Sequence, residues 1–342
     1  MKRCIPLGLL TAILLVLPLS TDNPFILHSF IMVLWYAYLA TSWNIVGGFA
    51  GQLSLGHSAF LTIGGYTSTL LFTYLHVTPW VGMLVGACIA ALVAVLIGVP
   101  SFRLKGAYYS LATIAFAEGL SIILQTVRDV GPVYLGAAEG IHVPLKPDPT
   151  FLDFQSNGKT LYYYVILGLL AVVLFTSWCI ERSRLGYYLT ALREDEEAAK
   201  ALGIDTRKSK LIAAGISAAF TAIGGTFFAQ LIRYLEPATI AGLDLSVQMV
   251  FVAVVGGLGT VFGPFVGSIA LTTIAQLTHV LWGGSVPGLH LIIYGVAVVA
   301  VVFFMPPGHG LVHLLSPHLP GTRRPGEELE VAAEEGLPEV NS

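Results

Sequence analysis

The residues that could carry chemistry in this chain do not form a catalytic set. The sequence offers no Ser-His-Asp combination and no group of His, Cys, Asp or Glu at recognisable metal-ligand spacing. Gly-Lys-Thr at 158–160 resembles the end of a P-loop, but that motif needs a glycine five residues before Gly158, where the chain has Asp153. We therefore expect neither an enzyme nor an ATPase, and no bound cofactor.

Three polar residues lie in or beside apolar segments and are candidates for lining a solute path. Glu118 is near the middle of the apolar run 107–127, where a carboxylate costs roughly 2.5–3.5 kcal/mol to insert. It either faces a path through the protein or makes a structural hydrogen bond to a neighbouring helix. His57 and Gln52 border a glycine-rich stretch, and each either caps or packs locally or contributes to the same path.

The most polar part of the chain is 191–210, which holds ten charged side chains. At 100° per residue, 188–202 is predicted to form a helix whose apolar face consists of Tyr188, Ala191, Leu192, Ala198, Ala199 and Leu202. Arg193–Glu197 and Glu196–Lys200 have the i,i+4 spacing of helix-supporting ion pairs. Gly203 is placed to end this helix, and Asp205 to cap the next. Because four consecutive acidic residues disfavour an anionic membrane surface, we expect this helix to dock on a partner protein.

The elements that carry these residues are membrane spans. The chain has 342 residues, of which 55% are hydrophobic and 11% charged, against about 25% charged in soluble domains. A membrane-spanning helix needs about 20 apolar residues. Ten such runs occur, at 5–19, 25–46, 57–75, 80–99, 107–127, 161–180, 211–231, 247–258, 264–282 and 289–305. The first also fits a signal peptide, but its Pro-Leu-Ser end is a poor cleavage site, so we expect an uncleaved span.

The distribution of lysine and arginine orients these spans, since both residues favour the cytoplasmic side. The loop 181–210 carries seven basic residues, whereas the longest loop on the opposite side, 128–160, carries three. We therefore place 181–210 in the cytoplasm and 128–160 outside, within a transmembrane domain over 1–310. The segment 311–342 combines Pro, Gly and Glu without an apolar period, which predicts a disordered cytoplasmic tail.

Two glycine-rich stretches interrupt the apolar pattern, GGFAGQLSLGH at 47–57 and GGLGTVFGP at 256–264. Non-helical backbone at membrane depth occurs only inside protein or along a wet cavity, so the stretches either border a path or allow close helix packing. The pattern Ala-Phe-x-x-Ile-Gly-Gly also occurs twice, at 59–65 and 219–225, which suggests an internal repeat. The predicted fold is an all-α polytopic membrane protein of about ten transmembrane helices, some broken at Gly-rich segments.

Four stretches resemble one protein family, in the order in which that family has them. They are GGFAGQLSLGHSAFLTIGGY (47–66), YYSLATIAFAEG (108–119), EAAKALG (197–203) and VVGGLGTVFGPFVG (254–267). The family is that of permeases of bacterial branched-chain amino acid ABC importers, the LivM type, and the similarity runs from about 30 to 310. Glu197, Ala198, Ala199 and Gly203 match the motif of its cytoplasmic coupling helix, which docks on the ATPase.

The resemblance implies a multi-pass permease of the bacterial inner membrane that passes branched-chain amino acids inward. Its partners would be a second permease subunit, two ATP-binding subunits and an external substrate-binding protein, with the lipid bilayer around it and no nucleic acid. ATP would be bound by the partners. Urea or short amides are alternative substrates, since their permeases share the fold. An ion-coupled secondary transporter using Glu118 is a further alternative, although it leaves the charged helix without a task.

Overall fold

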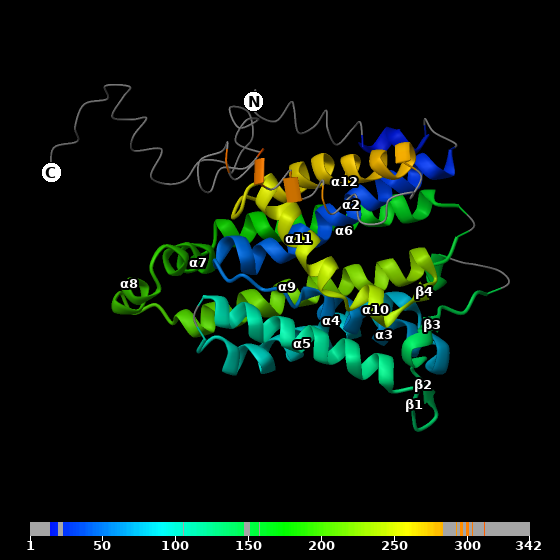
Figure 1. Ribbon diagram of the computed structural model, residues 1–342, viewed down its shortest axis with the longest axis horizontal. Coiled ribbons are helices and arrows are strands. Elements are labelled where there is room, and N and C mark those ends of the chain that lie inside the picture. The colour runs from blue at the N-terminus through cyan, green and yellow to red at the C-terminus, as the bar shows by residue number, and fades with distance from the viewer. Residues whose placement is uncertain are drawn as a thin grey trace.

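Helices make up most of the computed structural model (Figure 1). The structure describes residues 14–19, 23–104, 106–146, 151–156 and 158–282, together with scattered positions from 292 to 311. The predicted spans 5–19 and 289–305 and the tail 311–342 lie wholly or largely outside these residues.

The long helices follow the predicted spans in order. They are α2 (Pro24–Asn44), α3 (His57–Leu75), α4 (Pro79–Ser101), α5 (Ala107–Thr126), α6 (Thr160–Glu181), α9 (Thr206–Ile232), α11 (Leu243–Gly256) and α12 (Gly263–Trp282). Shorter helices are α7 (Arg184–Glu194), α8 (Glu196–Ala201), α10 (Pro237–Ile240), the π-helix η2 (Ile45–Phe49) and the 3-10 turns η1 (Leu17–Leu19), η3 (Ala137–Glu139) and η4 (Phe151–Asp153). Two antiparallel pairs join β1 (Asp129–Val130) to β2 (Val133–Tyr134) and β3 (Ile141–His142) to β4 (Tyr234–Leu235).

Among the described residues, six helical segments are long and apolar enough to cross a membrane: Pro24–Phe49, Pro79–Ser101, Ala107–Thr126, Thr160–Glu181, Thr206–Ile232 and Pro237–Gly256. Two further predicted spans also coincide with helices, α3 and α12. The predicted span 247–258 was too short, because α11 begins at Leu243 and continues the helical stretch from Pro237. The chain is therefore an all-α polytopic membrane protein, and the total of ten spans stays a prediction.

Local sequence explains where several helices begin. Pro24 and Pro79 occupy the first helical positions of α2 and α4, where a missing N–H costs nothing and the fixed φ favours the helix. The Asn23 side chain accepts a hydrogen bond from the backbone N–H of Phe25, 3.0 Å away. Proline and the Asn23 cap thus start α2, and proline starts α4, without a charged residue.

Close packing of α3 against α9 forms the centre of the bundle. A Cβ atom on Gly64 would collide with the carbonyl of Ala222, and one on Gly225 with the carbonyl of Leu61. The Thr226 hydroxyl also donates to the Gly64 carbonyl at 3.1 Å. The two copies of the repeated pattern, 59–65 and 219–225, are thus in direct contact, as expected for small residues that let membrane helices approach.

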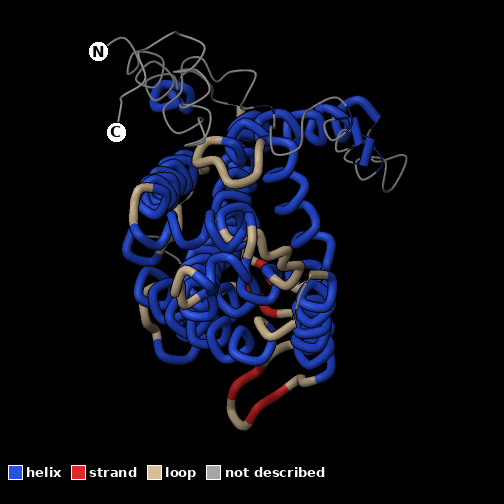
Figure 2. The backbone as a smooth tube through the Cα atoms, turned by 90° about the vertical axis from the view of Figure 1, so that its left-hand side faces the viewer, coloured by secondary structure: helices blue, strands red, loops and turns tan. Residues whose placement is uncertain are grey.

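The polar segments lie at opposite ends of this bundle. Figure 1 shows α7 and α8 at the left end, and the four strands with the loop around them at the right end. Figure 2, seen from the α7–α8 side, shows the β1–β2 hairpin projecting beyond the helices. The loops 181–210 and 128–160 are therefore separated by the length of the spans, as the charge distribution requires of loops on two sides of a membrane.

Candidate functional site

The charged segment folds as two helices, and the prediction of one helix over 188–202 was wrong. α7 ends at Glu194 and α8 begins at Glu196, with Asp195 between them in an extended conformation at φ −153°. The Asp195 carboxylate accepts hydrogen bonds from the backbone N–H groups of Glu197 at 2.8 Å and Ala198 at 3.0 Å. Asp195 is thus an N-cap that starts a new helix inside the charged run.

The buried face differs from the predicted one for the same reason. Leu192 and Ala199 are buried as expected, but Leu202 is 81% exposed and Tyr188 41% exposed. Leu189, which the prediction left out, is fully buried. Because the helical phase restarts at Asp195, one wheel of 100° per residue cannot describe both helices.

The predicted end of α8 is confirmed. Gly203 has φ +82°, and its N–H donates to the Lys200 carbonyl at 2.9 Å, while the N–H of Ile204 donates to the Ala199 carbonyl at 3.1 Å. This pair of bonds is a Schellman motif, which satisfies carbonyls that the helix end leaves free. Asp205 caps α9 as expected, because its carboxylate accepts from the N–H of Lys208 at 2.9 Å.

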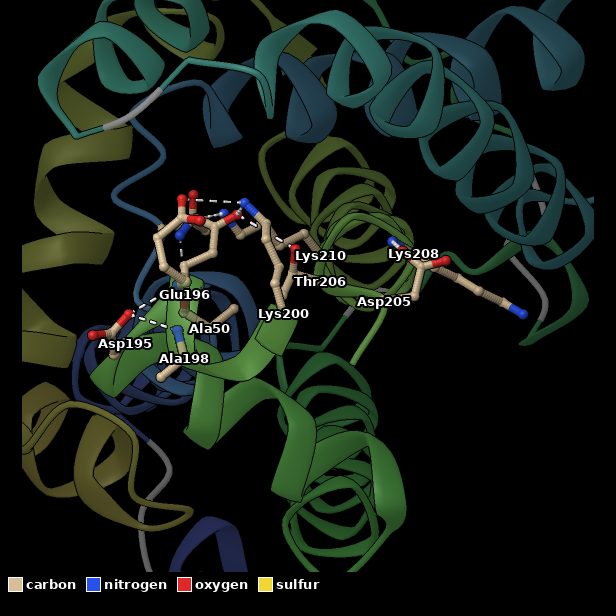
Figure 3. Close-up of polar contacts among 11 residues, drawn as sticks. Ala50, Asp195, Glu196, Ala198, Lys200, Asp205, Thr206, Lys208 and Lys210 are labelled. Carbon is tan, nitrogen blue, oxygen red and sulfur yellow. Dashed lines mark hydrogen bonds and ion pairs between the residues drawn. The ribbon is translucent and has the colours of Figure 1, made fainter. Parts of the chain in front are cut away.

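An ion cluster around Glu196 fixes α8 to the start of α9 (Figure 3). The Glu196 carboxylate lies 2.7 Å from Lys210 Nζ and 3.2 Å from Lys200 Nζ, which confirms the Glu196–Lys200 pair. The Lys210 side chain is only 3% exposed. Burial alone would raise the pKa of Glu196, but the hydrogen bonds and charges of Lys210 and Lys200 outweigh it, so the pKa lies below its usual value.

The residues of the predicted docking surface point in different directions. Ala199 is buried against the bundle, whereas Glu197, Ala198 and Gly203 are exposed. The exposed Leu202 lies beside them and is an apolar side chain facing outward at this end of the molecule. The exposed surface of α8 therefore combines acidic and apolar groups on a helix whose two ends are both capped.

Both glycine-rich stretches are breaks between helices, as predicted. The first comprises η2 and residues 50–56, and the second residues 257–262. The Asn44 side chain, at the end of α2 directly before the first break, bonds to the second break: its Nδ2 donates to the Thr260 carbonyl at 2.9 Å and its Oδ1 accepts from the Gly259 N–H at 3.0 Å. In the first break Gln52 bonds locally: its N–H donates to the Val46 carbonyl at 3.1 Å and its Nε2 to the Ala50 carbonyl at 3.2 Å.

His57 lies inside the bundle in a closed set of hydrogen bonds. The Ser217 hydroxyl donates to the Ser42 carbonyl at 2.7 Å, so it accepts from His57 Nε2 at 2.8 Å. The Nδ1 atom then accepts from the Ser54 hydroxyl at 3.0 Å. A neutral His57 with the proton on Nε2 satisfies every group, which is the geometry of a packing histidine. The ring also borders a small cavity with Tyr109 and Thr113 of α5.

Glu118 has different surroundings. It is half-buried on α5, and no hydrogen bond or ion pair to another described residue involves its carboxylate. Thr113, five residues or about 7.5 Å earlier on α5, accepts from the Leu55 N–H at 3.1 Å, so α5 packs on the first break. Of the two alternatives for Glu118, the structural hydrogen bond is therefore not formed within the part of the chain that the structure describes.

Comparison with known proteins gives matches that extend across most of this bundle. Residues 25–302 match the family described as branched-chain amino acid transport system, permease component. The high-affinity branched-chain amino acid transport system permease protein LivM of Escherichia coli (strain K12) is 31% identical over 263 residues, 71% of this chain and 61% of that protein.

More distant relatives carry other substrate names. The nucleoside ABC transporter permease protein NupC of Lactococcus lactis subsp. cremoris (strain MG1363) is 26% identical over 252 residues, 70% of this chain and 76% of that protein. The autoinducer 2 import system permease protein LsrC of Enterobacter sp. (strain 638) is 25% identical over 243 residues, 62% of this chain and 68% of that protein.

The match to LivM proteins is partial in length, since it spans 61% of the Escherichia coli protein and 62% of the one from Salmonella typhimurium. No solved structure matches the chain. The family model, however, covers most of the helical bundle and both glycine-rich breaks. The chain belongs to the family of permease components of branched-chain amino acid transport systems.

Proposed function

We propose that this chain is the permease subunit of an ABC importer that moves branched-chain amino acids across the inner membrane of a bacterium. It forms the inward path together with a second permease subunit. Two partner subunits hydrolyse ATP, and an external substrate-binding protein delivers the solute. The loop 181–210 faces the cytoplasm and the loop 128–160 faces outward.

The observation that carries this proposal is the construction of α8. A helix that receives force from a partner must be exposed, rigid and firmly attached to the spans. α8 is capped by Asp195, ended by Gly203 and tied to α9 through the 2.7 Å contact of Glu196 with buried Lys210. Its exposed surface with Glu197 and Leu202 is the proposed contact for an ATPase subunit.

The path itself is proposed to follow α5 and the first break. Glu118 is a half-buried carboxylate without a described partner, and it shares its side of α5 with Ser121 and Gln125, which bond to each other at 2.9 Å. Gln52 lies in the break on which α5 packs. His57 contributes by holding the break against α9, since its own polar groups are all bonded.

The substrate class rests on the LivM relatives. Related permeases are named for nucleosides and for autoinducer 2, and urea or short amides are further candidates within this fold. An ion-coupled transporter using Glu118 is the competing mechanism, and the observation that favours it is that no described residue pairs with this carboxylate.

Reconstitution separates these possibilities. The complete complex, with both permeases, the ATPases and the binding protein, is placed in liposomes containing ATP, and uptake of labelled leucine, isoleucine, valine, urea and a nucleoside is measured. We expect uptake of the branched-chain amino acids that requires internal ATP and is unchanged by collapse of the proton gradient. Uptake that continues without ATP and stops with the gradient would refute the proposal.

The contact with the ATPase is tested by Glu197→Arg. The side chain of Glu197 is 65% exposed, so the reversal should leave the protein inserted at normal levels. We expect weaker capture of the ATPase subunits in detergent pull-downs and loss of uptake. The same reversal at Glu334, in the tail, should change neither. Normal capture and normal uptake in Glu197→Arg would mean that this surface is only solvated.

A further inference from the structure

The Arg193 side chain points away from the charged segment and packs against the first glycine-rich break. It belongs to the last turn of α7, yet its side chain is only 22% exposed. Nη1 donates to the Gly48 carbonyl in the first break at 3.0 Å, and Nη2 contacts Glu194 at 3.1 Å. A Cβ atom on Gly51 would lie 2.7 Å from Arg193 Cγ, so the stem of the side chain also packs along this break.

The second break meets the same guanidinium. A Cβ atom on Gly259 would collide with Arg193 Nη1, and one on Gly48 would lie 2.6 Å from the Gly259 backbone nitrogen. Asn44 already joins Gly259 and Thr260 to the end of α2. These five residues, Asn44, Gly48, Arg193, Gly259 and Thr260, bring α2, both breaks and α7 to one point, which we call the arginine junction.

The junction contains backbone carbonyl and N–H groups whose hydrogen bonds are not made within a regular helix. At a helix break, carbonyl and N–H groups lose their partners, and inside protein they need replacements. Arg193 supplies the donor for the Gly48 carbonyl, and Asn44 supplies an acceptor and a donor for the second break. If Arg193 moves away, the Gly48 carbonyl loses this donor. The conformation of the breaks and the position of Arg193 are therefore linked.

Arg193 is also next to the proposed docking helix. Two residues separate it from Glu196, the first residue of α8, and the extended Asp195 lies between them. α8 is held to α9 through Glu196 and Lys210, whereas its chain connection on the other side runs straight into the junction. A displacement of α8 is thus transmitted along the backbone to Arg193 as well as through Glu196 to the start of α9.

We propose that Arg193 is a positioning residue that transmits movement of α8 to both glycine-rich breaks and so couples ATP hydrolysis to opening of the path. The inference rests on the proposed function, because it is the ATPase that would move α8. A side chain at 259 would collide with the guanidinium, and one at 48 would collide with Asn44 and the Gly259 backbone nitrogen, so glycine at both positions is what lets the two breaks meet at Arg193.

The test compares two arginines that each donate to a backbone carbonyl at the α7–α8 end of the bundle. Arg193→Met keeps most of the stem and removes the guanidinium. Arg207→Met removes the 3.1 Å bond from exposed Arg207 to the Val99 carbonyl of α4, which is outside both breaks. ATPase capture, ATP hydrolysis and leucine uptake are measured for the complete complex in liposomes.

We expect Arg193→Met to capture the ATPases and hydrolyse ATP, while leucine taken up per ATP falls at least about tenfold, the size expected for one charge-assisted hydrogen bond. Arg207→Met should keep the wild-type ratio. Arg193→Lys retains a charge and a donor and should fall between them. If Arg193→Met fails to insert into the membrane, the same measurement is made on Arg193→Lys.

Two results would overturn the inference. An unchanged ratio of uptake to ATP in Arg193→Met would show that the junction does not couple the two processes. Loss of ATPase capture in that variant would place Arg193 in docking instead. Failure of the wild-type complex to capture ATPases is a separate result, since it refutes the proposed function before any Arg193 variant is compared.

Discussion

At the scale of single residues, neighbouring glutamates in α8 have different energetic roles. Glu196 pairs with Lys210, whose side chain is 3% exposed, while Glu197 pairs with Lys200 at 3.5 Å and is 65% exposed. Removing one partner of a buried pair costs about 3–5 kcal/mol, whereas exposed pairs contribute about 0–1 kcal/mol. Since Glu196 is itself 25% exposed, its contribution to the free energy of unfolding is expected to be smaller than that of a fully buried pair.

Glu196→Gln should therefore lower the thermal unfolding temperature in detergent clearly more than Glu197→Gln. The effect depends on pH, because the folded-state pKa of Glu196 is lowered. A lowered carboxyl pKa stabilises the fold above the unfolded value of about 4.3, and this stability is lost as pH falls through the folded value. The difference in unfolding temperature between wild type and Glu196→Gln should be present at pH 7 and become smaller below about pH 4. Equal unfolding temperatures for both variants would contradict the buried-pair assignment.

Glu118 poses a functional question. Its carboxylate has no described partner, so Glu118→Gln removes charge without breaking an observed bond. We expect normal insertion, retained ATP dependence and a change in leucine uptake of less than about tenfold, or about 1.4 kcal/mol in the barrier. Thr126→Val, which removes the 2.8 Å bond from the exposed Thr126 hydroxyl to the Ile122 carbonyl, is the matched control on the same helix and should leave uptake unchanged. Complete loss of uptake in Glu118→Gln alone would instead indicate an essential ion-coupling group.

At the scale of elements, the sequence predicted most helices but not the local restart at Asp195. Hydropathy locates spans because the bilayer leaves few alternatives to a helix. The restart was hidden in a charged run, yet Asp195 is followed by Glu196 and Glu197 in the first turn of α8, a pattern typical of a helix start. The junction of Arg193 with Gly48 joins residues 145 positions apart, and no local signal reports such a contact.

Gly203→Val tests the end of α8. The position has φ +82° and no atom within 4 Å of an added Cβ, so the penalty is conformational, about 1–2 kcal/mol. We expect normal insertion, weaker ATPase capture and loss of uptake. Gly203→Asn, which tolerates this backbone region, should retain capture and uptake. Gly158→Val, in open space without a positive φ, should behave as wild type. Full capture by Gly203→Val would mean that the Schellman turn is not needed for docking.

At the scale of the whole molecule, the fold places two different polar structures at the two ends of one bundle. The α7–α8 end carries the capped helix and the arginine junction, and the opposite end carries the strands (Figure 1). Gly158 lies near the strands, because Ser156, two residues before it, accepts a hydrogen bond from Arg233 next to β4. Between them α3 and α9 pack through glycine backbone, so a shift at one end of α9 is carried along a stiff pair of helices. This division fits the proposed importer, in which solute would enter on one side and the ATPase would act on the other.

The orientation of these ends is the last prediction, and it depends on the excess of lysine and arginine in 181–210 over 128–160. In a variant with Cys4, Cys88 and Cys179 replaced, single cysteines are introduced at Gly158 and Lys200, two exposed positions at opposite ends of the bundle. An impermeant thiol reagent applied to intact cells should label Gly158→Cys, and Lys200→Cys only after the membrane is opened. Each site is thereby the control for the other. Labelling of both from outside would overturn the membrane arrangement, and labelling in the reverse order would invert it and move the ATPase contact to the strand end.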